Sequence, residues 1–342
     1  MSSELSIYYV NVDLNYQTSD FENNSVYLFD LINLSILTTI LCLLGIVSNI
    51  LNLIVFYKQT ITTVAISLIA LSITDLINVI LMEWVSISSY PPLLTLNDLI
   101  IFPRDVSYMT GGFPHGCMSR ITAWITVYMT AERCLCVALP LRVKFLITPR
   151  RTLVAMFFIY AFNLLPLVPL YLSSGLGWKY STVRNQSLIG RVYTADLSYL
   201  ENIGYFISTV LMMVAFIAVI FLTVLLTVQL HKMTKWRNKN SAVKDGLKNI
   251  TAKEKVALRT VLVIACVLVI TFIPSFTFCW IFFVVPDFRP DGRLKDAFFV
   301  IASFSFVFDS LNASTNTVWY FKMNSNYRKT FHRLFLKSLN QK

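Results

Sequence analysis

The sequence predicts an all-α membrane protein, a bundle of seven transmembrane helices followed by a short amphipathic eighth helix. Three observations lead to this prediction. Hydrophobic residues make up 56% of the 342 residues and charged residues only 14%, a composition that a water-soluble domain could not bury. Apolar runs long enough to cross a bilayer recur along the chain. Basic residues gather in the linkers between alternate runs, as they do on the cytoplasmic side of a membrane.

The residues before the first apolar run predict an extracellular tail at 1–30. No Lys or Arg precedes Lys58, whereas this stretch is acidic. It has neither the basic start nor the apolar core of a cleavable signal peptide, so we expect the first span to act as the signal anchor, with the N-terminus outside. One N-glycosylation sequon, at Asn23, falls in this tail, and another, at Asn185, falls in a predicted outer loop.

Six transmembrane helices are clear from hydropathy alone. A span needs about 20 mostly apolar residues, and it must be helical because lipid offers no partners to backbone polar groups. The six runs are 31–57, 64–89, 153–172, 202–230, 256–285 and 297–321.

A seventh span is predicted at 106–139, although Arg120, Glu132 and Arg133 interrupt it. Its stretch from Ile121 to Ala131 is uncharged. Without this span, the basic linkers that follow the third and fifth spans would lie on opposite sides of the membrane. With it, most of the 29 Lys and Arg residues fall on one side, the cytoplasmic side, and we expect a multi-pass protein of the plasma membrane.

The spans divide the chain into the tail at 1–30, a transmembrane domain at 31–321 and a cytoplasmic segment at 322–342. In this last segment apolar residues stand beside basic ones, which predicts an amphipathic helix lying on the anionic inner leaflet of the bilayer. Its members are Tyr327, Arg328, Lys329, Phe331, Arg333, Leu334, Phe335 and Lys337.

Four charged residues fall within predicted spans, namely Asp75, Glu83, Arg120 and Asp309. A charge at the bilayer centre costs roughly 2.5–3.5 kcal/mol on insertion scales, so such residues usually face the bundle interior and serve a function. Polar residues also recur every three or four positions on two helices, which places them on one face. Hydrogen bonding between helices is the simpler explanation of these stripes. The stripes are Thr122, Thr126, Thr130 and Arg133, and Asp309, Asn312, Asn316 and Tyr320.

These residues give the chain a resemblance to the rhodopsin-like G-protein-coupled receptors across about residues 31–335, and most closely to invertebrate peptide-type or chemosensory receptors. Each motif is weak alone, but five of them occur in order on the expected helices. They are Gly45-Ile-Val-Ser-Asn49, Leu71-Ser-Ile-Thr-Asp75, Glu132-Arg133-Cys134, Thr271-Phe272-Ile-Pro274 and Asn316-Thr-Val-Trp-Tyr320.

The chain departs from the pattern of that family at several positions. The cysteine that the family places at the outer end of the third helix would fall at Tyr108, and residues 173–200 contain no cysteine, so both partners of the family's outer disulfide are missing. Phe272 replaces a tryptophan, and Thr317 replaces the proline of the seventh helix. These changes bear on the geometry of activation more than on the fold.

The resemblance implies a switch at the cytoplasmic end. Arg133 would be its centre, next to Glu132, and an ion pair with Glu254 would hold the inactive state. Pro274, beside Phe272, would kink the sixth helix, because proline removes a backbone hydrogen bond. The inner end of that helix would then swing as a lever when the active state is favoured. From the seventh helix, Asn316 and Tyr320 belong to the same switch.

A central polar network is also implied by the resemblance. Its residues are Asp75 with Asn49, Thr122, Asn312 and Asn316. In relatives such a cluster holds a sodium ion, which would be the only cofactor of the protein. A hydrogen-bonded water cluster without sodium is the alternative, and the sequence leaves both open.

The candidate ligand pocket lies toward the outer half of the bundle. Arg120 precedes Arg133 by thirteen residues, which is roughly 20 Å along a helix. Glu83 and Asp309 are expected at a similar depth, and His115 stands where amine receptors carry an acid. Arg120 either meets a ligand or pairs internally with Asp309 or Glu83. The resemblance excludes a retinal Schiff base, because Ser310 stands where opsins carry a lysine.

The expected function is therefore that of a G-protein-coupled receptor, with an extracellular ligand, a heterotrimeric G protein and the lipid bilayer as partners. A transporter or channel that uses the buried charges is the alternative, although no repeat halves are visible. A seven-helix scaffold without signalling is a third possibility. We expect no enzyme, since no nucleophile–base pair or cofactor motif occurs, and no nucleic-acid partner, since the net charge of +11 lies in the linkers.

Overall fold

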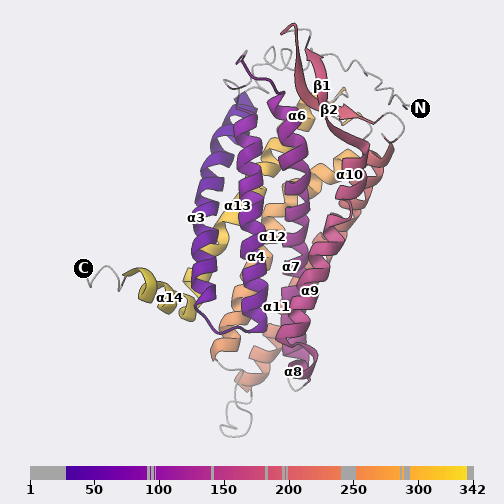
Figure 1. The fold of residues 1–342 in the computed structure, drawn as a ribbon. Helices are drawn as coiled ribbons and strands as arrows, with labels where there is room; N and C mark the ends of the chain where they lie inside the picture. Colours follow the sequence, from indigo (N-terminus) through magenta and orange to yellow (C-terminus); the bar gives the residue numbers. More distant parts are fainter. Residues whose placement is uncertain are drawn as a thin grey trace.

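The computed structural model describes residues 28–90, 93, 96, 98–139, 142–181, 184–194, 197, 199–239, 252–285, 287–288 and 293–336. Within these residues the chain forms a bundle of long helices with a two-stranded hairpin at one end (Figure 1). All seven predicted spans are helical. They are η2 (Asp30–Leu37) continued by α3 (Thr38–Tyr57), α4 (Thr63–Ser88), η3 (Tyr108–Gly112) continued by α7 (Phe113–Ala138), α9 (Pro149–Leu164) followed by α10 (Leu167–Ser173), α11 (Tyr199–Lys239), α12 (Ala252–Val284) and α13 (Lys295–Met323).

Shorter helices join or follow the spans. They are α6 (Pro103–Ser107), α8 (Val143–Leu146), α14 (Ser325–Phe331) and η5 (His332–Leu336). Two spans begin with side-chain caps that satisfy a free backbone N–H group. Thr62 accepts a hydrogen bond from the amide of Ala65 at the start of α4, and Thr148 accepts one from Arg151 at the start of α9.

Six of the described helices are long and apolar enough to cross a membrane, and the span that contains α7 is not among them. Its position explains why. α7 packs against α4, α9, α11 and α12, so that neighbouring helices rather than lipid surround it. Arg120, Glu132 and Arg133 are each buried on this helix. A central helix can therefore be more polar than its neighbours and still cross the bilayer.

The outer faces of the other helices carry the apolar residues that a lipid environment requires. Large side chains such as Leu44 on α3, Phe157 on α9 and Phe221 on α11 are exposed in the isolated chain. These faces, together with six apolar spans, identify a multi-pass membrane protein.

A β-hairpin that the sequence analysis did not predict covers one end of the bundle. Strand β1 (Ser174–Ser181) pairs antiparallel with β2 (Gln186–Tyr193), with Leu176 opposite Arg191. Asn185 lies at the tip with a positive φ of 54°, a conformation that asparagine adopts more readily than most residues. The hairpin lies at the end of the bundle opposite α8 and α14 (Figure 1).

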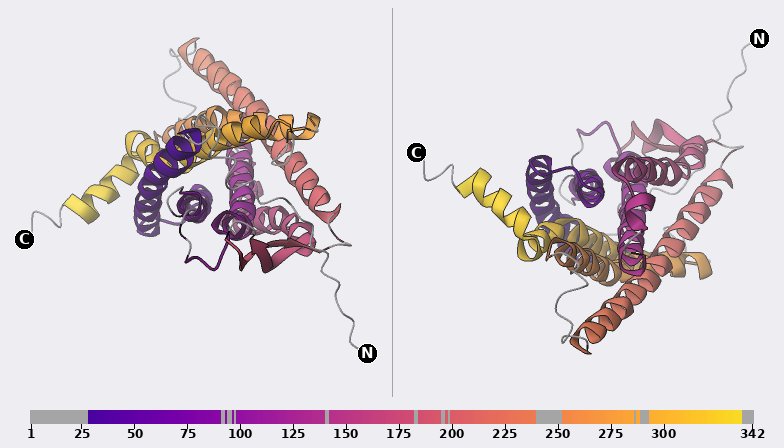
Figure 2. Two further views of the ribbon diagram at one scale, coloured as in Figure 1. Left: turned by 90° about the horizontal axis from the view of Figure 1, so that it is seen from above. Right: turned by 90° about the horizontal axis from the view of Figure 1, so that it is seen from below.

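The predicted eighth helix is present as α14 and η5. The side chain of Asn324 accepts hydrogen bonds from the amides of Asn326 and Tyr327, which caps α14. Tyr327 is fully buried, and its ring packs edge-on against Phe56 of α3. From this anchor α14 extends away from the bundle, as both views of Figure 2 show.

Candidate functional site

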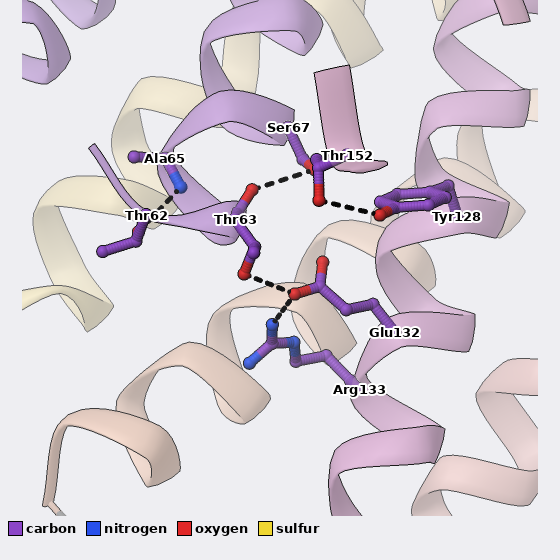
Figure 3. A network of polar contacts seen from close by, with 8 residues as sticks. All are labelled: Thr62, Thr63, Ala65, Ser67, Tyr128, Glu132, Arg133 and Thr152. Atoms are coloured by element: carbon purple, nitrogen blue, oxygen red, sulfur yellow. Dashed lines mark hydrogen bonds and ion pairs between the residues drawn. The ribbon is translucent and has the colours of Figure 1, made fainter. Parts of the chain in front are cut away.

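The inner end of α7 holds a buried ion pair between neighbouring residues. Arg133 Nη2 lies 2.5 Å from Glu132 Oε1, and both side chains are less than a tenth exposed. The same oxygen of Glu132 accepts a hydrogen bond from Thr63 Oγ1, at 2.7 Å (Figure 3). The carboxylate therefore ties the arginine to the first turn of α4.

Two further contacts lie beside this pair (Figure 3). Within α4, Ser67 Oγ donates to the backbone carbonyl of Thr63, at 3.3 Å. The hydroxyls of Tyr128 and Thr152 lie 2.9 Å apart and join α7 to α9. The ion pair therefore lies where α4, α7 and α9 are joined by hydrogen bonds. Sequence reasoning missed Thr63, because nothing local marks a hydroxyl 69 residues earlier in the chain as a partner of Glu132.

The predicted partner of Arg133 on the sixth helix is described only by its backbone. Glu254 belongs to the first turn of α12, and its side chain lies outside what the structure describes. The ion pair between Arg133 and Glu254 therefore stays a prediction. Asn23 likewise lies outside the described residues, whereas Asn185 is exposed at the tip of the hairpin.

Asp75 is the centre of the polar network and is fully buried. Its Oδ1 atom accepts a hydrogen bond from Thr122 Oγ1 of α7 at 2.8 Å, and its Oδ2 atom accepts one from Asn316 Nδ2 of α13 at 2.7 Å. A buried carboxylate is stable only when such donors replace water. The aspartate therefore joins α4, α7 and α13 at the middle of the bundle.

Asn49 also contacts α13, but through a backbone carbonyl of that helix and not through Asp75. Its Nδ2 atom donates to the carbonyls of Gly45, at 3.0 Å, and Ala313, at 2.8 Å. Gly45 allows this close approach, because a Cβ atom there would lie 2.7 Å from Ser314 Oγ. The contact fastens α3 to α13.

A second cluster, which sequence reasoning missed, continues toward the eighth helix. Asn52 Oδ1 accepts hydrogen bonds from Thr317 Oγ1 at 2.9 Å and from the hydroxyl of Tyr327 at 2.8 Å. Asn52 Nδ2 lies 3.4 Å from Asn49 Oδ1. The spacing of three residues between the two asparagines was the available signal, since it places both on one face of α3.

The remaining predicted switch residues lie on α12 and α13. Asn312 Oδ1 accepts a hydrogen bond from Thr271 Oγ1 at 3.2 Å, so Asn312 binds α12 and not Asp75. Phe272 is buried in an apolar cluster with residues of α7 and α11. Tyr320 is fully buried with its ring centroid 5.2 Å from that of Phe56. Pro274 lies inside α12, and the predicted kink and lever motion stay predictions.

The residues around Asp75 fit a single monovalent cation better than a divalent metal. The described residues contain no group of three or more His, Cys, Asp or Glu side chains that could hold a metal ion. The carboxylate of Asp75 carries one negative charge, and with the hydroxyl of Thr122 it offers hard oxygen ligands, which suits sodium. The two hydrogen bonds to Asp75 also satisfy the carboxylate without an ion. Sodium binding stays a prediction.

In the outer half of the bundle, the structure brings His115 and Asp309 together. His115 Nε2 lies 3.6 Å from Asp309 Oδ2, and both side chains are buried. Ser275 Oγ donates to Asp309 Oδ1 at 2.8 Å, and Ser119 Oγ lies 3.4 Å from Asp309 Oδ2. The two serines were not singled out from the sequence. Asp309, on α13, is thus contacted by side chains of α7 and α12.

Arg120 is held by different groups. Its Nη2 atom donates to the backbone carbonyl of Asn163 on α9 at 3.2 Å, and the thiol of Cys117 reaches the same oxygen at 3.1 Å. In the part of the chain that the structure describes, Arg120 forms no ion pair with Asp309 or Glu83. Internal pairing with either acid, one of the two expected alternatives, is therefore not seen. Glu83 is only partly buried, on α4.

Residues 36–338 match the family model described as "Serpentine type 7TM GPCR chemoreceptor Srw". The match begins within the first span and covers the other six spans and the eighth helix. A search of curated proteins found no match.

Proposed function

This chain belongs to the Srw family of serpentine seven-transmembrane chemoreceptors, which are G-protein-coupled receptors, and on that premise we propose that it binds an extracellular ligand and activates a heterotrimeric G protein. The ligand is a peptide or a small chemosensory molecule. The receptor sits in the plasma membrane with its N-terminus and hairpin outside and with α8 and α14 inside. This orientation agrees with the basic character of the linkers on the α8 side.

The observation that carries the proposal is the buried pair of Glu132 and Arg133. Separating a buried arginine from its carboxylate costs free energy, because the charge is left unpaired. Arg133 would therefore leave Glu132 only in a state that offers it another partner. In this proposal the active state frees Arg133 from Glu132, which Thr63 holds in place, and presents the arginine to the G protein. The ligand acts by binding that state more tightly, which shifts the population toward it.

The polar residues in the outer half of the bundle support recognition of a polar ligand. We call them the outer cluster; they are His115, Ser119, Arg120, Ser275 and Asp309. Two of its buried nitrogen atoms, Arg120 Nε and His115 Nδ1, have no hydrogen-bond partner among the described residues. Buried polar groups are normally satisfied, so the cluster retains hydrogen-bonding capacity that a polar ligand would use. Arg120 would serve an anionic group and Asp309 a donor group of the ligand, with Glu83 nearer the rim.

The test is a ligand screen in cells that express the wild type or Arg133→Ala at equal surface level. Pools of peptides and small polar molecules are applied, and cAMP and calcium are both measured. We expect a pool that elicits a G-protein response from the wild type and none from Arg133→Ala. Responses of equal size in both, or an ion current without any G-protein response, would contradict the proposal and favour a transporter or channel.

A further inference from the structure

The β1–β2 hairpin continues the chain from α10 and is attached to the rest of the bundle without a disulfide. No cysteine occurs between residues 173 and 200. One edge of the hairpin is fixed by backbone hydrogen bonds, because Ile189 pairs with both Ile100 and Phe102 at 2.8 Å. Asp105 adds to this edge by accepting a hydrogen bond from the amide of Arg191 at 3.2 Å. These contacts form a short hinge beside α6.

The base of the hairpin is held against the bundle by the side chain of Arg191, which lies on β2 two residues after Ile189. Its guanidinium carbon lies 5.4 Å from the ring centroid of Tyr108, 5.2 Å from that of Phe113 and 4.6 Å from that of Tyr193. Aromatic faces carry a negative quadrupole, so a cation within about 6 Å of several rings is attracted by all of them. The planar guanidinium suits such a cage better than an ammonium group does.

Glu201 neutralises the caged charge. Its Oε1 atom lies 2.8 Å from Arg191 Nη2, and the two side chains are 17% and 10% exposed. Arg191 Nε also donates to Ser174 Oγ on the neighbouring strand at 3.1 Å. One side chain therefore links β1 and β2 to η3, α7 and the first turn of α11.

The rings that form the cage are themselves held in place. The hydroxyl of Tyr108 contacts that of Tyr205 on α11, and the Phe113 ring packs edge-on against Tyr108. Burial raises the pKa of Tyr193 to about 12, so this phenol stays neutral near pH 7. The cage thus keeps its shape around the cation.

We propose that Arg191 is a latch that holds the base of the hairpin against the outer ends of α7 and α11 and thereby fixes the shape of the ligand entrance. The role at the entrance rests on the proposed receptor function, whereas the latch itself does not. When Arg191 leaves the cage, the hairpin stays attached by the backbone contacts of its hinge and turns about them away from α7 and α11. Arg191 is a positioning residue in this account and makes no contact with the ligand.

Hydrogen exchange of the purified full chain in lipid nanodiscs tests the latch. Arg191→Met removes the charge and keeps an apolar side chain of similar length. We expect the hairpin amides at 175–180 and 187–192, other than those of residues 189 and 191 at the hinge, to exchange about tenfold faster or more, because the local opening no longer breaks the cage contacts. The amides of α7 and α13 should be unchanged. Trp178→Phe, which alters an exposed ring of the same hairpin, is the matched control and should behave like the wild type.

Three further variants distinguish the cage from a simple ion pair. The charge swap Arg191→Glu with Glu201→Arg keeps an ion pair but places a carboxylate against three ring faces, so protection should not return. Arg191→Ala should regain protection when methylguanidinium is added, and Arg191→Ala with Tyr193→Ala should not. Restored protection in the charge swap, or wild-type exchange in Arg191→Met, would overturn the proposal. These readouts need neither ligand nor G protein, so failure of the latch is distinguishable from failure of the proposed receptor function.

Discussion

At the scale of single residues, the structure shows how a bilayer protein keeps charges inside. Asp75 has two neutral donors, and Glu132 has one charged and one neutral donor. Removing one partner of a buried ion pair typically costs about 3–5 kcal/mol, whereas the intact pair contributes little net stability. Such pairs are therefore better suited to switching than to stabilising the fold.

Thr63 is expected to restrain the switch. Thr63→Val removes the hydroxyl that donates to Glu132 and keeps the volume of the side chain. A hydrogen bond to a charged group contributes about 1.5–3 kcal/mol, so its loss should raise basal G-protein activity several-fold at equal surface level. Thr63→Ser retains the hydroxyl and should match the wild type. Equal basal activity in all three proteins would show that Thr63 does not hold Glu132.

Asp75 is expected to confer sensitivity to sodium. The purified receptor should unfold at a higher temperature in sodium chloride than in choline chloride of equal concentration, since a ligand that binds only the folded state stabilises it. Asp75→Asn removes the negative charge and should abolish the difference. If the wild type shows no difference between the two salts, the network is satisfied by hydrogen bonds alone.

The buried charges were predicted from the sequence, but only some of their partners were. The grouping of Asp75 with Thr122 and Asn316 was implied by the resemblance to the receptor family. The pairing of His115 with Asp309 and the capture of Arg120 by a backbone carbonyl of α9 could not be predicted. Both depend on how helices far apart in sequence are rotated and offset against each other.

At the scale of elements, the hairpin is the part that sequence reasoning missed. A two-stranded hairpin is marginal by itself, so its existence depends on contacts made with the bundle. Gly190 marks one such contact. A Cβ atom at this position would lie 2.8 Å from Phe102 Cδ2 and 2.9 Å from Asp105 Oδ2. The strand thus needs glycine to approach the segment around α6.

Gly190→Ala is expected to loosen the hinge edge of the hairpin. The added methyl group must displace Phe102 or Asp105, so exchange of the amides of Ile189 and Phe102 should accelerate. Gly175→Ala is a matched control on the partner strand, because a Cβ atom there meets nothing within 4 Å. Hydrogen exchange in nanodiscs measures both. Acceleration of the same size in the two variants would mean that the close approach at Gly190 is not needed.

At the scale of the whole molecule, one polar helix lies inside a shell of apolar ones. Hydropathy identifies the six spans that meet lipid and fails for α7, because other helices surround it. The basic linkers predicted the span of α7 instead, because only a seventh span places these linkers on the same side of the membrane. The bundle and its eighth helix were therefore predictable, whereas the hairpin and the packing that sets the outer cluster were not.

The proposed orientation predicts that Asn185 carries an N-linked glycan. Asn185 begins the sequon Asn185-Gln-Ser187 and is exposed at the tip of the hairpin. Asn185→Gln should lower the apparent mass of the protein made in animal cells, and treatment with an N-glycosidase should remove the difference. Asn249 also begins a sequon, in the linker after α11, and serves as the control. A glycan at Asn249 would show that this linker lies outside the cell and would contradict the proposed orientation.

The most direct test of the central claim is the basal activation of G protein by Glu132→Gln, compared with the wild type and with Glu132→Gln combined with Arg133→Ala. All three are matched for surface level, and Glu254→Ala is measured beside them. We predict raised basal activity in Glu132→Gln, because Arg133 loses its charged partner, and loss of that activity when Arg133 is also removed. Basal activity that is unchanged in Glu132→Gln, or raised equally with and without Arg133, would contradict the claim that this buried pair is the switch.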